Sequence, residues 1–600
     1  ERLTMRSDSR VYSTIANQHD ILNPQTRLEV RWQDIKLDFV PRFSFKSWYK
    51  GLEQNKDTIT ALNGCHGHAN PGELVAILGP SGSGKTKLLE VLSCRLAGGK
   101  LEGYVLVNGQ KRTGSFRHAA AYVEQGTSQL DSLFTVREMM EFTARLCLPK
   151  RYSESEKAER IERLLVVLGL DELEDVIIGT TEKSGLSFGE RKRLLIALKL
   201  LREPRVIFFD EPTSGLDSTA ANTLIIQLQQ LALLDNLTII LSVHQPRPSM
   251  LDHFDRLILL GKGRTIFEGS LTETLRYFRR HGHDCPKDVN PADFFIDLIS
   301  SNMVPPAEKP WNINVVEGED GLTKFERNTT RWEEYKALMG REYLYFKRSG
   351  NSYWIILLIN IILALFIGFV WFQIPDEGYQ AVQNRVGLLV FLPRDRTVVL
   401  AIISVLCGAK EGIRRERYSS MYRPSSYYAM LLTFNAVMEL LFATCFLISV
   451  YYIAGLRYTP FTALLTLAGL HMLILLAAYG IGIIAACIFD DFTVAFMVAM
   501  SVNLIWFLFG GLLVNTEDIS WVLRWIRYLS PHFYYTLGAN QNEFDGQTLD
   551  GQPGSFWLQL YAFDLVSVVW CAGALLIFNV VLHLVGYCLL HIRTKPKFII

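Results

Sequence analysis

One stretch of the chain has the residue types and spacing of a phosphate-binding loop. It reads G-P-S-G-S-G-K-T, follows an apolar run and precedes a segment with helical spacing. Glycines let successive backbone N–H groups curve around phosphate oxygens, and the start of a helix adds a favourable dipole. Lys85 would then reach the terminal phosphates, and Thr86 would bind magnesium. The sequence therefore predicts a nucleotide site made by Gly79, Pro80, Ser81, Gly82, Ser83, Gly84, Lys85 and Thr86.

Two adjacent carboxylates end another apolar run. Asp210 and Glu211 directly follow Val206–Phe209. At the end of a strand beside bound phosphates, Asp210 is suited to hold magnesium and Glu211 to polarise the attacking water. The alternative is a pair of solvated acids at the end of a strand.

The elements around these residues predict an α/β domain. Leu74–Leu78 and Leu237–Val243 are short apolar runs suited to buried parallel strands, and Lys85–Leu96 has helical spacing. We expect this domain over residues 28–300, after a disordered lead at 1–27. The net charge of +1 gives no basic face for nucleic acid, so that class of partner is excluded. The nine cysteines lack the paired spacing of a zinc site.

The second half of the chain is dominated by apolar segments. Six are long enough to cross a hydrocarbon core of about 30 Å, at Trp354–Phe372, Val386–Ala409, Ala429–Leu456, Phe461–Phe489, Phe492–Val514 and Phe563–Leu590. The second contains Arg394, Asp395 and Arg396. Either these charges face a cavity or the helix begins later, near Thr397, and we favour the later start.

A linker and an amphipathic connecting helix at 301–348 are expected to join the two halves, and the membrane domain to occupy 349–600. Arg331–Arg348 mixes basic and aromatic residues as a helix at the membrane surface does, with an ordinary solvated helix as the alternative. The distribution of basic loops predicts that both termini are cytoplasmic.

Further motifs resemble the series found in ABC ATPases. They are L-S-F-G-E at 186–190, D-E-P-T at 210–213, G-L-D at 215–217 and H-Q-P at 244–246. The resemblance implies an α/β P-loop NTPase domain followed by an all-α, six-helix transmembrane domain. It implies that Gln125 contacts magnesium and that His244 contacts the γ-phosphate. The implied catalytic set is Glu211, His244 and Gln125, and the implied magnesium ligands are Thr86, Gln125 and Asp210.

The same resemblance implies that ATP binds between two chains. In that family the signature residues, here Ser187, Phe188, Gly189 and Glu190, grip the nucleotide bound to the other subunit. Asp217 resembles the residue that crosses the dimer interface. With one ATPase domain in the chain, a dimer is expected, either with itself or with another half-transporter.

The membrane half is similar to the G subfamily of ABC half-transporters. This similarity is carried by the order of the two domains and by the motifs E-R-K-R at 190–193, N-P-A-D-F at 290–294, Q-N-R-V-G at 383–387, M-Y-R at 421–423 and G-L-L-V-N at 511–515. It implies ATP-driven export, or translocation between membrane leaflets, of an amphipathic or lipid-like substrate, by default at the plasma membrane with internal membranes as the alternative. It also implies an external loop at 515–562. The substrate cavity would be lined by Asn503, Trp506, Phe507, Leu512 and Leu513, with ordinary helix packing as the alternative.

Three positions depart from the family pattern. Leu37 stands where an aromatic residue usually stacks on adenine, so Trp32 or Phe39 would substitute or the affinity for ATP would be lower. Lys87 replaces a small hydroxyl residue, and Phe188 adds bulk in place of a signature glycine. The expected activity is ATP hydrolysis, at an ordinary or a reduced rate, and the alternative is a weakly active subunit of an obligate heterodimer.

Overall fold

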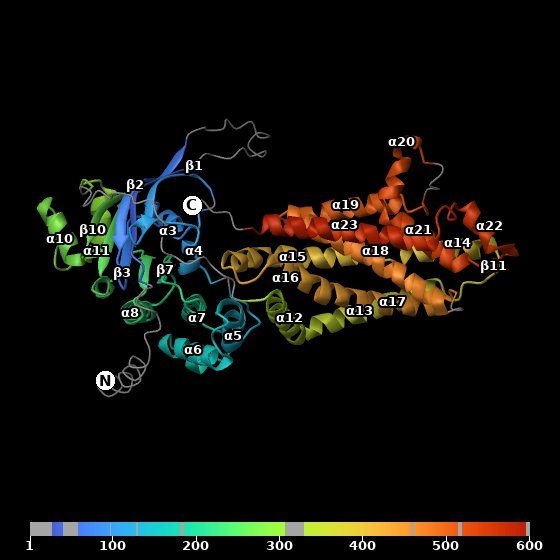
Figure 1. Cartoon of the computed structure of the whole chain (residues 1–600), viewed down its shortest axis with the longest axis horizontal. Helices are drawn as coiled ribbons and strands as arrows, with labels where there is room; N and C mark the ends of the chain where they lie inside the picture. Colours follow the sequence, from blue (N-terminus) through green and yellow to red (C-terminus); the bar gives the residue numbers. More distant parts are fainter. Residues whose placement is uncertain are drawn as a thin grey trace. The chain divides into compact units, whose positions relative to one another are not determined.

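The computed structural model describes residues 27–39, 58–96, 98–127, 130–179, 185–306, 329–457, 461–513 and 519–595. Residues 1–26 of the predicted lead and 307–328 of the predicted linker lie outside this part of the chain. The chain forms two compact units, one ending at Thr329 and the other beginning at Thr330. The two larger sheets belong to the first unit and the long apolar helices to the second (Figure 1).

The first unit is built on a six-stranded sheet with the order β10-β9-β3-β8-β7-β6. The five strands from β9 to β6 are parallel, and β10 pairs antiparallel with β9. Parallel strands with both faces covered need continuous apolar runs, which is the pattern that the sequence has here. The strands are β3 Leu74–Leu78, β6 Ala120–Val123, β7 Val206–Phe209, β8 Thr238–Ser242, β9 Arg256–Gly261 and β10 Arg264–Gly269.

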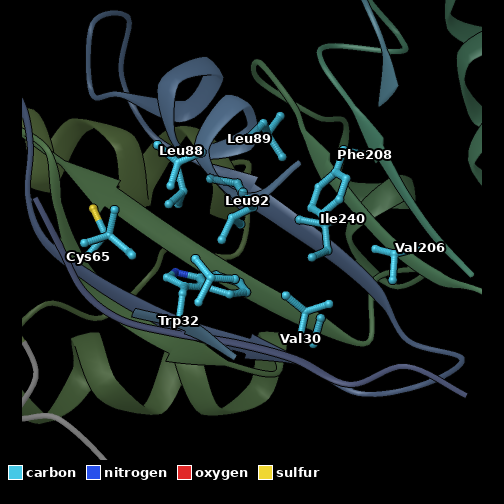
Figure 2. Packing of buried hydrophobic residues seen from close by; sticks show 14 of the residues in the cluster. Val30, Trp32, Cys65, Leu88, Leu89, Leu92, Val206, Phe208 and Ile240 are labelled. Carbon is cyan, nitrogen blue, oxygen red and sulfur yellow. The ribbon is translucent and has the colours of Figure 1, made fainter. Parts of the chain in front are cut away.

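A second, antiparallel sheet has the order β2-β1-β4-β5. Its strands are β1 Val30–Phe39, β2 Ile59–Ala69, β4 Lys100–Val107 and β5 Gln110–Lys111. The core between the sheets packs Trp32 of β1 and Cys65 of β2 against helix α3, Lys85–Leu92 (Figure 2). Because α3 starts at the last residues of the phosphate loop, this core fixes where the loop lies.

The helices of the first unit have strong local start signals. Capping boxes, in which a Ser or Thr side chain and a Glu three residues later bind each other's backbone N–H, begin α5, α6, α7 and α10. Asp217 caps the start of α8. The helices are α4 Phe116–Ala119, α5 Val136–Cys147, α6 Glu154–Val167, α7 Phe188–Leu200, α8 Ser218–Leu234, α9 Pro248–Leu251, α10 Leu271–Arg280 and α11 Pro291–Ser300, with a 3₁₀ turn at Asp171–Leu173.

The second unit is helical. It begins with α12 Arg331–Arg348 and continues with α13 Gly350–Val370, α14 Tyr379–Phe391, α15 Asp395–Tyr418, α16 Pro424–Met430, a π-helical turn Leu431–Asn435, α17 Ala436–Ala454, α18 Phe461–Ile488, α19 Phe492–Leu508 and α23 Val568–Arg593. Among the described residues, four helical stretches are long and apolar enough to cross a membrane: Tyr353–Val370, Pro424–Ala454, Phe461–Ile488 and Val568–Arg593. The fifth predicted segment forms α19, which is shorter. α18 packs against α15, α19 and α23, and 72% of its most apolar window is buried against 17% for α13 and α23. α18 is therefore the core helix, and α13 and α23 present apolar surface for lipid.

The second predicted segment is interrupted at residues 392–394, just before Asp395 and Arg396. α14 ends at Phe391, and α15 begins at Asp395, close to the later start predicted near Thr397. Asp395 is buried, Asn503 donates a hydrogen bond to its carboxylate, and His532 Nε2 lies 3.3 Å from it. A buried charge with such partners is tolerated inside a membrane, so a helix start at Asp395 is compatible with a membrane-spanning position.

The described part of the predicted external loop, residues 519–562, contains short helices. These are α20 Trp521–Arg524, a 3₁₀ turn Trp525–Leu529, α21 Pro531–Phe544 and α22 Gly554–Leu560, with a two-stranded hairpin of β11 Thr548–Leu549 and β12 Gln552–Pro553. Asn515 and its neighbours lie outside the described residues. Phe533, Leu537 and Trp557 form one apolar cluster with Val382 of α14, so much of this segment is packed rather than extended.

Candidate functional site

The phosphate loop connects β3 to α3, and its shape depends on glycine at two positions. A Cβ added to Gly79 would lie 2.3 Å from the backbone oxygen of Leu260. Gly84 has φ +100°, which side-chain-bearing residues rarely adopt. Lys85 Nζ donates to the backbone oxygens of Gly79 at 2.7 Å and Pro80 at 3.1 Å. Its ammonium group therefore lies over the loop, where phosphates would bind.

Asp210 sits at the carboxyl end of β7 and is held by hydroxyl groups from three other segments. Thr86 Oγ1 and Ser242 Oγ donate to Asp210 Oδ1 at 3.1 and 2.8 Å. The Tyr122 hydroxyl donates to Oδ2 at 3.3 Å. Because β3, β6, β7 and β8 are parallel, their carboxyl ends share one edge of the sheet, and this edge collects the polar side chains.

Gln125 and Glu211 lie side by side at the same edge. Gln125 Nε2 donates to Glu211 Oε2 at 2.8 Å, and the Glu211 backbone N–H donates to Ser242 Oγ at 2.9 Å. Glu211 has φ 45°, an unfavourable conformation for a residue with a side chain and one that is typical of functional sites. His244 lies in the exposed turn after β8, and within the described residues it makes no hydrogen bond to Gln125 or Glu211.

The charges of this edge act on its lysine. Burial lowers the pKa of Lys85, while the carboxylates of Glu211 and Asp210 raise it, and the net shift is downward. The two carboxylates thus favour the charged ammonium that phosphate binding requires.

The residues present fit a nucleotide phosphate with a divalent cation. Thr86, Gln125 and Asp210 offer a hydroxyl, an amide and a carboxylate oxygen, the hard ligands that Mg²⁺ prefers. In the loop, Ser83 Oγ is buried and makes no hydrogen bond within the described chain, so it is free to bind a phosphate oxygen.

The predicted signature residues lie in a separate place on the same unit. Ser187 caps α7 and forms a capping box with Glu190, and Asp217 caps α8 by accepting from the N–H groups of Thr219 and Ala220. They line a cavity of about 530 Å³, together with Gly189. No residue of the phosphate loop lines this cavity, so one described chain does not bring loop and signature together.

Phe188 changes the form of the signature. Its side chain is 36% exposed, and a Cβ added to Gly215 would lie 2.9 Å from Phe188 Cε1. The ring therefore lies directly on the backbone of Gly215, two residues before Asp217, and occupies part of the surface that faces the cavity.

Comparison with known proteins identifies the family. A family model described as ABC transporter matches residues 62–214, and two described as ABC-2 type transporter match residues 244–315 and 333–544. The chain is 32% identical over 545 residues to the "Broad substrate specificity ATP-binding cassette transporter ABCG2" of Rattus norvegicus, covering 82% of this chain and 81% of the relative. It is 32% identical over 513 residues to "ABC transporter G family member 12" of Dictyostelium discoideum, covering 82% of this chain and 79% of that relative. The chain belongs to the G subfamily of ABC transporters. This confirms the family and the fold class that the motifs predict.

As an ABC transporter the chain binds nucleotide in its first unit and couples ATP hydrolysis to transport across a membrane. Its second unit is the integral membrane part.

The two aromatic residues expected to substitute for Leu37 in stacking on adenine differ in accessibility. Leu37 and Trp32 are both fully buried in the core of β1, so Trp32 cannot stack on a base. Phe39 is half-buried at the end of β1, and Lys87 Nζ lies 5.8 Å from its ring centroid. Of the two, Phe39 is the one with an accessible ring.

The residues predicted to line a substrate cavity occupy different environments. Asn503 is buried within the chain and bonded to Asp395, and the Phe507 ring lies 5.9 Å from that of His532. Trp506 is tied through its carbonyl, which accepts from Ser530 at 2.6 Å. Leu512 packs on the cluster of α14 and α21, whereas Leu513 is 55% exposed. These contacts favour a packing role for Asn503, and Leu513 is the most accessible of the five.

Sequence reasoning missed three residues of the ATP site. Ser242 ends β8 and Tyr122 lies in β6, and each brings a hydroxyl group into a buried and largely apolar strand. Lys192 lies in α7 and is fully buried. The available signal was the same for all three, a polar residue at a position where strand or helix periodicity requires an apolar one.

Proposed function

We propose that this transporter exports an amphipathic or lipid-like substrate as a dimer of half-transporters. The observation that carries the dimer is the separation of the phosphate loop from the signature cavity, since each chain holds two incomplete halves of an ATP site. Two chains arranged head to tail would place each loop against the partner's signature. The broad substrate specificity for which the rat relative is named supports an amphipathic cargo. We propose the plasma membrane as its location, with both termini cytoplasmic.

The proposed chemistry transfers the terminal phosphoryl group of ATP to water. The loop from Gly79 to Thr86 would cradle the phosphates, and Thr86, Gln125 and Asp210 would hold Mg²⁺, which neutralises charge on the phosphates when bound. Glu211 would polarise the attacking water and His244 would contact the γ-phosphate. Positioning and charge stabilisation then carry the reaction, without a covalent intermediate.

ATP hydrolysis by the purified protein in lipid tests this proposal, with wild type beside Glu211→Gln and with sterols, lipids and drugs added in turn. We expect turnover that Glu211→Gln abolishes and that one class of compound stimulates. Glu141→Gln is the matched carboxylate-to-amide control, because Glu141 is exposed, pairs with Arg145 on α5 and belongs to no part of the proposed site. Wild-type turnover equal to that of Glu211→Gln would contradict a self-sufficient homodimer.

A second candidate is a weakly active subunit that works only beside an unlike half-transporter. It is favoured by the contact of the Phe188 ring with Gly215, since this bulk lies where backbone must approach a phosphate closely. Phe188→Gly should then raise ATP turnover several-fold. If Phe188→Gly hydrolyses ATP at the wild-type rate or below it, this candidate fails.

A further inference from the structure

Lys192 is a buried cation that no proposed step of hydrolysis uses. It lies on α7, five residues after the signature residue Ser187, and its side chain is fully buried. Its Nζ donates to the backbone oxygen of Gln125 at 2.6 Å and to that of Glu124 at 3.2 Å. These are the two residues that follow β6, the strand leading to the ATP site.

The contact between Lys192 and the backbone of Gln125 joins two segments that have different roles in the proposed ATP cycle. The start of α7 carries the signature, which faces a nucleotide held by the partner chain. Gln125 faces the chain's own site, where its side chain donates to Glu211 Oε2 at 2.8 Å and lies 3.4 Å from Ser214 Oγ. Because Ser187 caps α7 and Lys192 lies on the same helix, a movement of α7 would reach the carbonyl of Gln125 through the Lys192 side chain.

Burial of the Lys192 ammonium group costs free energy. A residue that carries this cost is expected to do something that an apolar residue could not. Burying an ammonium group disfavours its charged form, and burial lowers the pKa of Lys192 to about 8 although Asp210 and Glu211 raise it. A core that needed only volume here would be as well served by methionine or leucine. A cation with several N–H donors, by contrast, can hold two adjacent backbone oxygens at once.

We propose that Lys192 is a positioning residue that ties the signature helix to the backbone of Gln125 and so sets the approach of the Gln125 side chain to Glu211. This inference rests on the roles proposed above for Gln125 and Glu211. In an assembled dimer it gives each chain a direct mechanical link between the ATP held by the partner and its own catalytic edge.

The test compares Lys192→Met, which keeps the length of the side chain and removes its donors, with Lys192→Arg, which keeps donors and charge. Arg112→Met is the matched control, because Arg112 is also a buried cation that donates to two backbone oxygens, those of Val91 at 2.7 Å and Leu92 at 2.8 Å. Those oxygens lie at the far end of α3 from Lys85. All are made in the full chain, purified in lipid.

We expect Lys192→Met to lower kcat about 10- to 100-fold, the loss typical of a misplaced catalytic group, with little change in the KM for ATP. Lys192→Arg should recover part of kcat. Arg112→Met should melt at a lower temperature and keep the wild-type kcat. Amide exchange of residues 120–125 without nucleotide should be faster in Lys192→Met only. Equal losses of kcat in Lys192→Met and Arg112→Met would overturn the proposal, as would unchanged exchange in Lys192→Met.

A Gln125→Ala variant separates this proposal from the function on which it rests. If Gln125→Ala lowers kcat and Lys192→Met does not, the role of Lys192 is wrong and the proposed site stands. If Gln125→Ala leaves kcat unchanged, the role proposed for Gln125 is itself wrong, and the positioning role of Lys192 falls with it.

Discussion

Gly79 and Gly82 belong to one loop but resist substitution for different reasons. A Cβ at Gly79 meets the backbone oxygen of Leu260 at 2.3 Å, whereas a Cβ at Gly82 meets nothing within 4 Å. Gly82 has φ +78°, so alanine there costs about 1–2 kcal/mol in backbone conformation alone. Alanine at Gly79 must move β9 or the loop, at about 1–3 kcal/mol, and displaces the backbone that binds phosphate.

We therefore expect Gly79→Ala to weaken binding of a fluorescent ATP analogue about tenfold or more, since 1.4 kcal/mol is tenfold in affinity. Gly82→Ala should lower the melting temperature and weaken binding less. Equal weakening by the two substitutions would contradict the steric argument at Gly79.

At the scale of residues, the sequence predicts the motifs at the ends of strands better than it predicts the side-chain contacts that hold these motifs in place. Gly79–Thr86, Asp210 and Glu211 form contiguous motifs whose meaning depends only on neighbours in the chain. Lys192 and Ser242 act through Gln125 and Asp210, which lie 67 and 32 residues away in the sequence. Tertiary packing brings the members of each pair together. No local pattern specifies such a partner, although a lysine on the apolar face of a helix indicates that its ammonium group has a buried partner.

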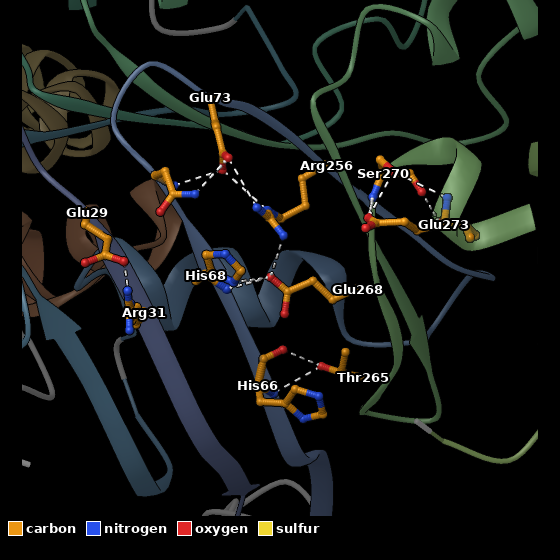
Figure 3. A network of polar contacts seen from close by, with 12 residues as sticks. Glu29, Arg31, His66, His68, Glu73, Arg256, Thr265, Glu268, Ser270 and Glu273 are labelled. Atoms are coloured by element: carbon orange, nitrogen blue, oxygen red, sulfur yellow. Dashed lines mark hydrogen bonds and ion pairs between the residues drawn. The ribbon is translucent and has the colours of Figure 1, made fainter. Parts of the chain in front are cut away.

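At the scale of elements, Arg256 connects three segments of the first unit. It lies at the start of β9, and its guanidinium donates to Glu73, which precedes β3, at 3.2 and 3.3 Å. Glu268 of β10 lies 3.8 Å from the same guanidinium and 2.6 Å from His68 Nδ1 of β2 (Figure 3). Burial raises the pKa of Glu73, but hydrogen bonds from Arg256 and Asn70 outweigh it, so the net shift is downward.

Arg256→Gln should destabilise the first unit by about 1.5–3 kcal/mol at pH 7, the range for hydrogen bonds to charged groups. A carboxyl whose pKa is lowered on folding stabilises above its ordinary pKa of 4.5, and this contribution is lost as the pH falls through the lowered value. The gap in melting temperature between wild type and Arg256→Gln should thus narrow as the pH falls below 4.5. Arg279→Gln, which breaks an exposed ion pair with Asp284, is the control. It should change neither the melting temperature nor its dependence on pH. A gap that stays constant with pH would rule out Glu73 as its source.

The second unit contains a buried ion pair between α14 and α21. Arg385 Nη1 lies 2.7 Å from Glu543 Oε1, with 3% and 1% of the two side chains exposed. Arg385 also donates to the backbone oxygen of Ile374 at 3.2 Å, and the backbone N–H of Arg457 donates to Glu543. The pair thus joins the segment before α14, α14 itself, the end of α17 and α21 at one point.

Removing one partner of such a pair leaves an uncompensated buried charge, which costs about 3–5 kcal/mol. We expect Arg385→Met to lower the melting temperature in detergent and to reduce the amount of folded protein recovered from the membrane. Arg414→Met in the same unit is the control, since Arg414 is 37% exposed and its ion pairs with Glu411 and Asp490 are at the surface. If the two variants have the same melting temperature, the ion pair between Arg385 and Glu543 does not stabilise the packing of these elements.

The same elements show why hydropathy alone misplaces the second span. The apolar residues from Val386 onward continue past the point where α14 ends, so a window average sees one segment. The break between α14 and α15 is stabilised by His532 of α21 and Asn503 of α19, which contact Asp395. Those helices lie more than 100 residues further along the chain, as the separation of 108 between Asp395 and Asn503 shows.

At the scale of the whole molecule, the proposed dimer is the arrangement that would complete the ATP site. The loop and the signature lie apart in one chain, and both carry an exposed serine, Ser81 and Ser187. If two chains meet head to tail, Ser81 of one chain faces Ser187 of the other across the bound nucleotide. Cysteines at the two positions would then lie between chains, within the reach of an oxidant or a short cross-linker, only when ATP closes the pair.

The experiment uses a variant whose nine cysteines are replaced, with Ser81→Cys and Ser187→Cys added and Glu211→Gln included to hold ATP uncleaved. We expect a covalent dimer on a non-reducing gel after oxidation or short cross-linking with ATP, and a monomer without ATP. Ser81→Cys alone and Ser187→Cys alone are the controls, and each should stay monomeric, because the same position does not meet itself in a head-to-tail pair. A dimer band from either single variant at the same yield would place the two chains differently. A monomer band with ATP, from a protein that still binds ATP and forms particles of two chains, would overturn the head-to-tail arrangement, because the loop of one chain would then not face the signature of the other.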